Sequence, residues 1–328
     1  MKALALLSGG LDSTLAVKMI LERGIDVVAL NFVTPFCLCR KGGCGAGEAA
    51  KAFNIPLKVF SADKEYLRVI RNPKFGYGKN LNPCVDCRIF MLKKAKRYAK
   101  ETGAAFIFTG EVLGQRPMSQ HKAALDLIEK EAGLKGKIVR PLSAKLLPKT
   151  EAEKMGLIDK EALMDISGRS RKRQIEMTKQ FNIVNYPCAG GGCLLTDKEF
   201  ASKLRDLFKH KKRVTVKEVN LLKVGRHFRL GKNKIIVGRN KAENELLLRS
   251  KRKGDYYFEV PYWGSPISIL EGPKTKKAIR TAAALTIFHS DKKSGDAPVS
   301  FGKAALDKNI VACAFNREEV DKLRISYA

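Results

Sequence analysis

A short segment near the N-terminus has the residue types and spacing of a phosphate-binding loop. Ser8-Gly9-Gly10-Leu11-Asp12-Ser13 stands between an apolar run and a helical pattern. Its glycines let backbone N–H groups approach a phosphate, and the N-terminus of the following helix adds a partial positive charge. Ser8 and Ser13 supply hydroxyl donors, and Asp12 suits such a loop where it binds a divalent cation held by the phosphate. A capped helix after a glycine turn is the bland alternative, and it accounts less well for the complete segment.

Eight cysteines are the second set of side chains that can do chemistry. They occupy positions 37, 39, 44, 84, 87, 188, 193 and 313. Cys84 and Cys87 form a C-x-x-C pair at an expected helix start, where the helix dipole lowers the pKa of a thiol. No small-residue cleavage site follows the apolar N-terminus, so we expect a cytoplasmic protein whose cysteines serve metal or redox chemistry rather than disulfides.

Three interpretations of these cysteines stay open. In the first, Cys84, Cys87 and Cys193 hold a [4Fe–4S] cluster and leave one iron open to sulfide. In the second, one cysteine becomes a persulfide and another resolves it as a disulfide. In the third, Cys188 joins the three in a zinc site. Buried, inert cysteines are the alternative without chemistry. No role is assigned to the cysteines at positions 37, 39 and 44, and the one at 313 is expected in the core.

The elements that must position these groups alternate between strand and helix over the first half of the chain. Apolar runs predict strands at 2–7, 26–32, 57–60, 104–108 and 138–142, and amphipathic segments predict helices at 11–23, 46–53, 87–101 and 118–131. Short buried strands that alternate with helices are typical of a parallel sheet with helices on both faces, a Rossmann-like α/β fold. Such sheets bind ligands beyond the carboxyl ends of their strands, where the glycine loop is expected to lie.

The chain is expected to form two domains, at residues 1–200 and 201–328. The second is a smaller α+β domain, with a hairpin predicted around 231–233, a strand at 255–261 and a helix at 274–289. It contains 29 Lys and Arg against 13 Asp and Glu, a net charge of +16, and the whole chain carries +30. This charge favours an anionic partner, nucleic acid, over a thermophile-like excess of lysine. No apolar run of about 18 residues is present, so no membrane-spanning helix is expected.

The expected RNA contacts come from two basic segments and one further arginine. Lys and Arg in such segments contact phosphates, which sets affinity but not sequence preference. Ordinary solvated surface is the alternative for any charge run. The candidate RNA-binding residues are Arg169, Arg171, Lys172, Arg173, Lys211, Lys212, Arg213 and Arg239.

Four stretches of the sequence resemble known families. Residues 8–13 resemble the pyrophosphate loop of the PP-loop ATP pyrophosphatase superfamily, whose members split ATP between the α and β phosphates and adenylate a substrate oxygen. Residues 109–120 (TGEVLGQRPMSQ) resemble tRNA 4-thiouridine synthases, with one extra residue after Gln115. Residues 82–87 (NPCVDC) resemble tRNA 2-thiouridylases. Segments between 237 and 293 resemble the RNA-binding domain of NFACT proteins.

The resemblance implies an adenine nucleotide alpha hydrolase-like fold, ATP with Mg²⁺, and two partners. These partners are tRNA and a sulfur donor, either sulfide or a persulfide carrier protein. The implied ATP-binding residues are Ser8, Gly9, Gly10, Asp12, Ser13, Asn31, Phe32, Gly110 and Gln115. The implied catalytic residues are Asp12, Cys84, Cys87 and Cys193, of which the three cysteines are also the candidate ligands of the [4Fe–4S] cluster.

The sequence therefore predicts an ATP-dependent tRNA sulfurtransferase that makes thiouridine. The segment around Gln115 favours 4-thiouridine, and the Cys84/Cys87 pair is compatible with the alternative product, 2-thiouridine. A PP-loop amide ligase that acts on a small metabolite is a second class, and the basic C-terminal region argues against it. A non-catalytic RNA-binding factor is a third class, and the intact glycine loop argues against that.

Overall fold

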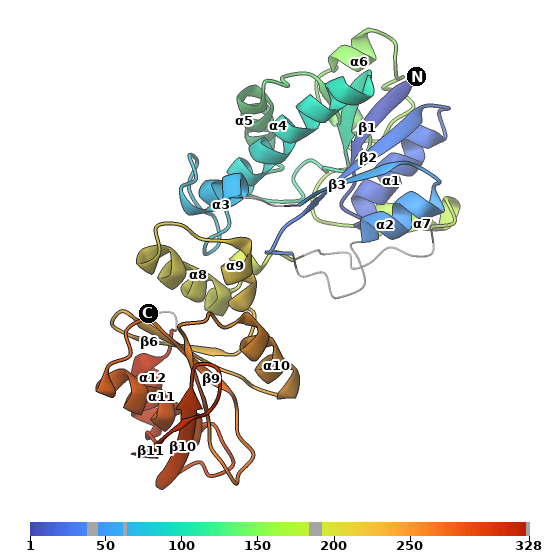
Figure 1. Cartoon of the computed structure of the whole chain (residues 1–328). Coiled ribbons are helices and arrows are strands. Elements are labelled where there is room, and N and C mark those ends of the chain that lie inside the picture. The colour runs from blue at the N-terminus through green and yellow to red at the C-terminus, as the bar shows by residue number, and fades with distance from the viewer. Residues whose placement is uncertain (38–44, 62–63, 184–191, 326–328) are drawn as a thin grey trace. The chain divides into compact units, whose positions relative to one another are not determined.

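The computed structural model describes residues 1–37, 45–61, 64–183 and 192–325 (Figure 1). The chain forms two compact units, Met1–Thr196 and Asp197–Ala328. The division falls four residues before the boundary expected at residue 200. Over the described ranges, no helix is long and apolar enough to cross a membrane.

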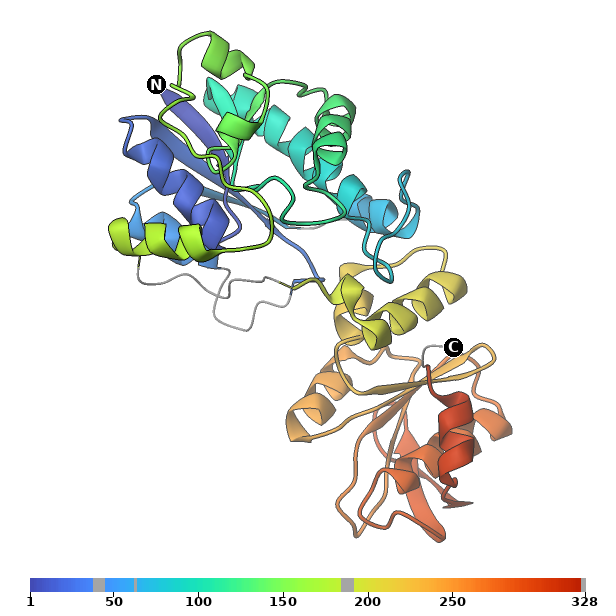
Figure 2. The same cartoon turned by 180° about the vertical axis from the view of Figure 1, so that it is seen from behind.

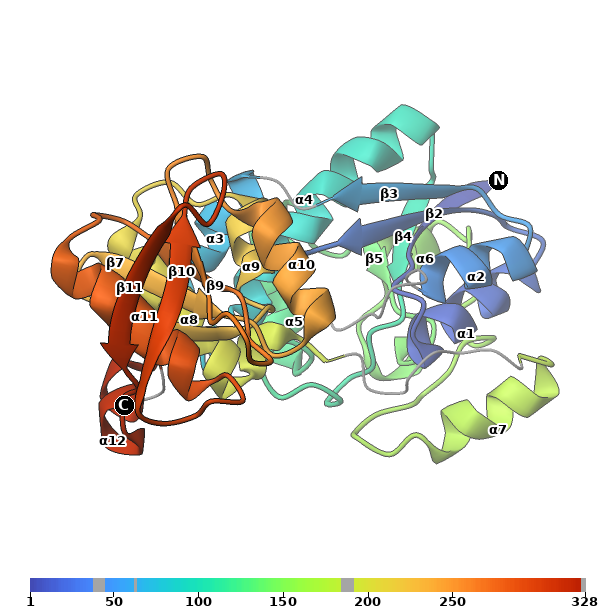
Figure 3. The same cartoon turned by 60° about the horizontal axis from the view of Figure 1, so that its bottom comes forward.

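The first unit contains a five-stranded sheet in the order β3-β2-β1-β4-β5, and every pair of neighbouring strands is parallel. The strands are β1 (Lys2–Leu6), β2 (Asp26–Val33), β3 (Leu57–Ser61), β4 (Phe106–Thr109) and β5 (Ile138–Val139). The arrowheads of β2 and β3 lie at the same edge of the sheet (Figure 3). This topology confirms the predicted Rossmann-like fold, and all five predicted strands form with small shifts of their ends.

Helices cover both faces of this sheet, as the two opposite views show (Figures 1 and 2). Ala3 and Ala5 of β1 pack in one apolar cluster and Leu4 and Leu6 in another, because successive side chains of a strand point to opposite faces. The first cluster includes residues of α1 (Leu11–Leu21), α2 (Gly45–Ala52), α6 (Glu151–Lys154) and α7 (Lys172–Gln180). The second includes residues of α4 (Cys84–Thr102) and α5 (Lys122–Ala132), and α3 (Lys64–Arg71) packs on α4.

The second unit is built on a six-stranded sheet in the order β11-β10-β8-β9-β7-β6, with antiparallel neighbours. Its strands are β6 (Arg226–Leu230), β7 (Asn233–Val237), β8 (Tyr256–Glu259), β9 (Ser268–Glu271), β10 (Asp296–Gly302) and β11 (Lys308–Cys313). Its helices are α8 (Lys198–His210), α9 (Val216–Leu221), α10 (Lys241–Ser250), α11 (Lys276–Phe288) and α12 (Arg317–Leu323). The predicted hairpin is the β6–β7 pair, and α11 packs on β8, β9 and β11. This unit confirms the predicted second α+β architecture.

Some details of the sequence prediction were wrong. Helix α5 begins at Lys122, four residues after its predicted start, and β5 has only two residues. Helix α4 begins at Cys84, three residues before the predicted start, so both cysteines of the C-x-x-C pair are helical. Cys313, expected in the core, is exposed because it ends β11, the edge strand of the second sheet. An edge strand has only one neighbour and leaves alternate side chains to solvent.

Candidate nucleotide and thiol site

The glycine loop joins the end of β1 to the start of α1 and is closed by its own serines. The hydroxyl oxygens of Ser8 and Ser13 lie 3.0 Å apart, and Ser13 Oγ donates a 2.9 Å hydrogen bond to the Gly10 carbonyl oxygen. Gly9 has φ +76°, and a Cβ there would lie 2.1 Å from the Ala46 nitrogen. Only glycine fits at this position, because the backbone angle and the neighbouring chain both exclude a side chain.

Helix α1 begins without a side-chain cap. Its N-cap residue is Gly10, and no side chain accepts a hydrogen bond from the first turn at that end. Helix α8 shows the contrast, since Asp197 accepts a hydrogen bond from the Phe200 N–H. The first N–H groups of α1 are therefore left to solvent or to a bound anion. This is the feature expected of a phosphate loop and not of an ordinary capped helix.

The neighbouring strands hold the loop from two sides. Gly110, which follows β4, lies so close that a Cβ there would be 2.5 Å from backbone atoms of Asp12 and Ser13. Asn31 of β2 is buried, and its Nδ2 donates a 2.8 Å hydrogen bond to the Leu7 carbonyl oxygen. The structure thus places two of the residues predicted for ATP binding, Asn31 and Gly110, against the loop.

Asp12 lies among polar groups from two later parts of the first unit. Gln174 Nε2 of α7 donates a 3.4 Å hydrogen bond to Asp12 Oδ1. Burial raises the pKa of the Asp12 carboxyl, whereas the guanidinium groups of Arg171 and Arg116 lower it. The Gln115 side chain donates to the Asp12 carboxyl and lowers its pKa, whereas Gln174 Oε1 is buried and has no hydrogen-bond partner among the described residues. Such an orphaned group beside a carboxylate fits a site that a nucleotide and its metal ion complete.

Four cysteine thiols lie near one another at the N-terminal end of α4. Cys84 is the first residue of this helix, and Cys87 Sγ lies 3.2 Å from the Tyr66 hydroxyl oxygen. Cys37 and Cys193 pair in an isolated antiparallel β-bridge. Burial, together with the thiols of Cys87, Cys84 and Cys37, raises the pKa of Cys193 to about 12. The structure thus brings together the three cysteines proposed from the sequence and adds Cys37, to which no role was assigned.

The thiols of α4 are not acidified in the way the helix position predicts. Burial raises the pKa of Cys84, although the guanidinium groups of Arg116 and Arg88 oppose that rise. Burial also raises the pKa of Cys87, although the Tyr66 hydroxyl opposes it. The prediction was wrong because desolvation of the thiolate outweighs the partial charge of the helix N-terminus. These thiols lose their protons when a metal ion displaces the proton or a base removes it.

The thiols fit an iron–sulfur cluster by the chemistry of their donor atoms, since cysteine sulfur is the usual ligand of such clusters. Among the described residues, no group of three or more His, Cys, Asp or Glu side chains already has metal-binding geometry. Cys188, the fourth ligand in the zinc interpretation, lies outside the described residues, as do Cys39 and Cys44.

Arg116 links the glycine loop to the thiols electrostatically. Its guanidinium lowers the pKa of both the Asp12 carboxyl and the Cys84 thiol. One positive charge therefore acts on both groups, at the edge of the sheet where a ligand of this fold binds. The sequence analysis missed this residue because Arg116 occupies the stretch after Gln115 where the match to the 4-thiouridine synthases is interrupted.

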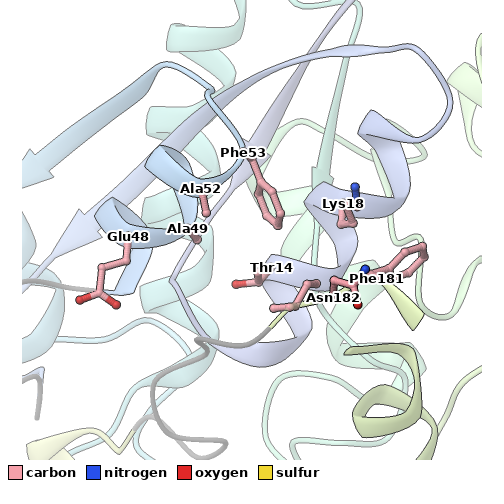
Figure 4. A pocket seen from close by; sticks show the side chains of 9 residues that line it. Thr14, Lys18, Glu48, Ala49, Ala52, Phe53, Phe181 and Asn182 are labelled. Atoms are coloured by element: carbon pink, nitrogen blue, oxygen red, sulfur yellow. The ribbon is translucent and has the colours of Figure 1, made fainter. Parts of the chain in front are cut away.

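Two cavities lie near this region. One of about 410 Å³ lies between α1, α2 and the residues after α7, and Thr14 and Lys18 are among the side chains that line it (Figure 4). A smaller one of about 120 Å³, at the carboxyl ends of β2 and β3, is lined by Phe32 and Tyr66 among others. Because Tyr66 also contacts Cys87, the smaller cavity adjoins the thiols. The larger cavity instead follows the flank of α1.

The candidate RNA-binding residues have different surroundings. Arg171 acts on Asp12, and it is the N-cap residue of α7. Arg173, Lys211 and Arg239 each form an ion pair with an acidic side chain of their own unit. The remaining four, all exposed, are Arg169, Lys172, Lys212 and Arg213.

Two protein-family models match the chain. Residues 1–155 match the model described as thiamine biosynthesis protein (ThiI), and residues 225–324 match the NFACT protein RNA binding domain. These matches confirm the family resemblances drawn from the sequence. The first match ends before Cys193, so it leaves that cysteine without support from the family model.

Similar proteins include tRNA-thiolating enzymes. A probable tRNA sulfurtransferase of Thermococcus kodakarensis is 30% identical over 174 residues, which cover 51% of this chain and 40% of that protein. A tRNA-specific 2-thiouridylase of Leptospira biflexa is 33% identical over 125 residues, which cover 33% of each chain. A solved structure of a 4-thiouridine synthetase–RNA complex with bound ATP is 23% identical, with a TM-score of 0.38, over 67% of this chain and 52% of that one. The chain thus spans at most about half the length of these relatives.

Proposed function

We propose that this protein is an ATP-dependent tRNA sulfurtransferase that adenylates a carbonyl oxygen of a tRNA uridine and replaces that oxygen with sulfur, giving 4-thiouridine. The observation that carries the proposal is that one unit holds both the uncapped glycine loop with Asp12 and the thiols at the start of α4, and that Arg116 acts electrostatically on Asp12 and Cys84. A reaction that adenylates a carbonyl oxygen and then bonds sulfur to the same carbonyl carbon needs its nucleotide loop and its sulfur-handling groups in the same site.

The glycine loop carries the first step. The uncapped N–H groups of α1 and the hydroxyls of Ser8 and Ser13 bind the pyrophosphate portion of ATP. The uridine oxygen attacks the α phosphorus, the bond to the β phosphate breaks, and pyrophosphate leaves. Asp12 would hold Mg²⁺, which supplies positive charge to the departing pyrophosphate. The oxygen is now part of an AMP ester and can leave with AMP.

The thiols carry the second step. Cys84, Cys87 and Cys193 would hold the [4Fe–4S] cluster, which when bound supplies an open iron for sulfide. Sulfide sulfur forms a bond to the activated uridine carbon, and the carbon–oxygen bond breaks to release AMP. The persulfide route remains the competing version of this step. In this route one cysteine carries a persulfide and delivers the outer sulfur, and a second cysteine then forms a disulfide with the first. Cys37 and Cys193 are candidates for such a pair, because their backbones lie side by side in a β-bridge.

The second unit is proposed to bind the RNA. Residues 201–328 of this unit carry a net charge of +16, which suits the phosphate backbone. The match of residues 225–324 to an RNA-binding domain model supports the same role. Exposed side chains such as Lys212 and Arg213 are suited to phosphate contacts. Phosphate contacts of this kind set affinity for tRNA, whereas the choice of uridine rests with the first unit.

The alternative product is 2-thiouridine. The C-x-x-C pair on α4 and the 33% identity to a 2-thiouridylase favour it. The choice of 4-thiouridine rests on the resemblance of residues 109–115 and on the sulfurtransferase relative. An amide ligase acting on a small metabolite is disfavoured, because such a substrate needs neither the basic second unit nor the thiols.

A pyrophosphate-release assay tests the proposed function. The full chain is incubated anaerobically with ATP, Mg²⁺, sulfide and bulk tRNA, and pyrophosphate is counted with and without tRNA. We expect release that depends on tRNA, is lost in Asp12→Ala and is kept in Asp126→Ala, an exposed control on α5. Pyrophosphate release that does not depend on tRNA, or that Asp12→Ala retains, would contradict the proposed function.

A further inference from the structure

A cavity of about 160 Å³ lies in the second unit, beside the C-terminal end of α8 and strands β6 and β7. This volume corresponds to about five water molecules at ~30 Å³ each. It is enough for a small tetrahedral anion. Basic and acidic side chains both line it: Lys211, Arg229, Lys232, Lys234 and Arg252, together with His210, Asp255 and Glu271.

Three of these cations are already neutralised by carboxylates. Arg229 Nε donates a 2.9 Å hydrogen bond to Asp206 Oδ1. Lys211 Nζ lies 2.7 Å from Glu218 Oε1, and Arg252 pairs with the same carboxylate. These ion pairs hold the three side chains in place at the edge of the cavity.

Lys234 differs from its neighbours. It is 5% exposed, and none of the described residues forms a hydrogen bond or a close ion pair with its ammonium. In the sheet register Lys234 is paired with Arg229 on one side and with Glu271 on the other. Paired residues of neighbouring strands project to the same face, so a second cation lies directly beside Lys234. The Glu271 carboxylate is shared with Lys211, at 3.6 Å.

This arrangement is costly for the fold. Burial lowers the pKa of Lys234 to about 8, although Glu271 and Asp206 oppose that shift. Ile236, two residues along β7, packs in an apolar cluster with Leu247. An uncharged side chain would therefore suit the position of Lys234 better than a buried ammonium. A ligand that brings negative charge into the cavity explains why a lysine stands there.

We propose that this cavity, the Lys234 pocket, binds the terminal phosphate of a phosphate monoester, with the Lys234 ammonium as the donor at its closed end. A monoester has three terminal oxygens and up to two negative charges, and it can enter a closed pocket from one side. An internal phosphodiester has one negative charge and two free oxygens, and it carries a ribose on both sides. The terminal phosphate of an RNA chain and a free phosphate compound share this chemistry. The proposal is independent of sulfur transfer at the first unit.

Binding measurements on the full chain separate these sources. In one arm, fluorescence anisotropy compares tRNA carrying a 5′-phosphate with the same tRNA after phosphatase treatment. In the other arm, calorimetry measures inorganic phosphate and AMP. Each arm uses the unmodified chain, Lys234→Met, and Lys241→Met as a charge-matched control, since Lys241 is exposed and does not line the cavity.

We expect removal of the 5′-phosphate to weaken binding to the unmodified chain and to Lys241→Met about tenfold, and to have little effect on Lys234→Met. In a second outcome, Lys234→Met loses binding of inorganic phosphate and AMP, while RNA binding does not depend on the 5′-phosphate. That result supports the pocket and assigns it to a free phosphate compound. The proposal is overturned when Lys234→Met matches the control in both arms.

A measurement that needs no variant covers the case in which Lys234→Met does not fold. Acetylation of lysines in the unmodified chain is quantified by mass spectrometry with and without inorganic phosphate and 5′-phosphorylated tRNA. We expect selective protection of Lys234 by at least one of these ligands, relative to Lys241. Equal acetylation of Lys234 under every condition would overturn the proposal.

Discussion

Replacing Lys234 by methionine is expected to stabilise the second unit. The lysine places a positive charge in a buried position, and methionine fills a similar volume without one. In the unfolded chain the ammonium regains its hydration at no cost. The free energy of unfolding of the second unit should therefore rise in Lys234→Met, although the variant loses a side chain proposed to bind a ligand.

The magnitude and its pH dependence follow from the pKa of Lys234. The folded value of about 8 lies below the ordinary value of 10.5, and one pKa unit corresponds to about 1.4 kcal/mol. The stabilisation should therefore reach about 3 kcal/mol at pH 7, where the lysine is charged in both states. It should fall below about 1 kcal/mol at pH 10, where the folded lysine is neutral and only the unfolded one still binds a proton.

Urea unfolding followed by tryptophan fluorescence measures this effect selectively. The chain contains one tryptophan, Trp263, and it lies in the second unit. Lys241→Met is the control and should change the free energy of unfolding little at either pH. A destabilised Lys234→Met protein at pH 7, or a stabilisation of equal size at pH 7 and pH 10, would refute the argument from burial.

Three further predictions concern the loop, its support and the RNA. Gly110→Ala should abolish tRNA-dependent pyrophosphate release, because the added Cβ would collide with the start of α1. Gly47→Ala is the control and should retain release, because a Cβ at Gly47 meets open space. Retention of release in both variants would contradict the close approach of Gly110 to α1. Glu111→Gln should lower the free energy of unfolding by about 3 kcal/mol in urea titrations, since it breaks the 3.1 Å ion pair with the buried Arg140; a change below about 1 kcal/mol would count against this. Removal of residues 197–328 should weaken tRNA binding and flatten its dependence on salt, and an unchanged slope of log affinity against log salt would exclude the second unit as the RNA-binding part.

The fold was largely predictable because its local signals agree with one another. Buried apolar runs that alternate with amphipathic segments specify a parallel sheet, and the glycine loop follows the strand at which this fold binds ligands. Even the hairpin between β6 and β7 is marked by its turn residues, with Gly231 at φ +54°. Such features depend on neighbours in the sequence, so a single sequence reveals them.

The site was less predictable because its parts meet across long separations. Cys37 and Cys193 pair through a bridge that joins residues 156 positions apart, and nothing local to Cys37 marks it. The raised pKa values of the thiols depend on burial, which the helix position of Cys84 does not reveal. Lys234 likewise stands in an ordinary strand pattern, and only packing against other elements shows that its charge is enclosed.

Nucleoside mass spectrometry of tRNA tests the central claim most directly. Bulk tRNA is incubated anaerobically with the iron-reconstituted full chain, ATP, Mg²⁺ and sulfide, then digested and analysed. We expect 4-thiouridine in an amount that matches the AMP released. We expect its loss when Cys84, Cys87 or Cys193 is replaced by alanine. Full thiolation by the iron-free protein, with a persulfide on one of these cysteines, would exclude the cluster mechanism and support the persulfide mechanism. AMP release without any thiouridine from the reconstituted protein would contradict the proposed function itself.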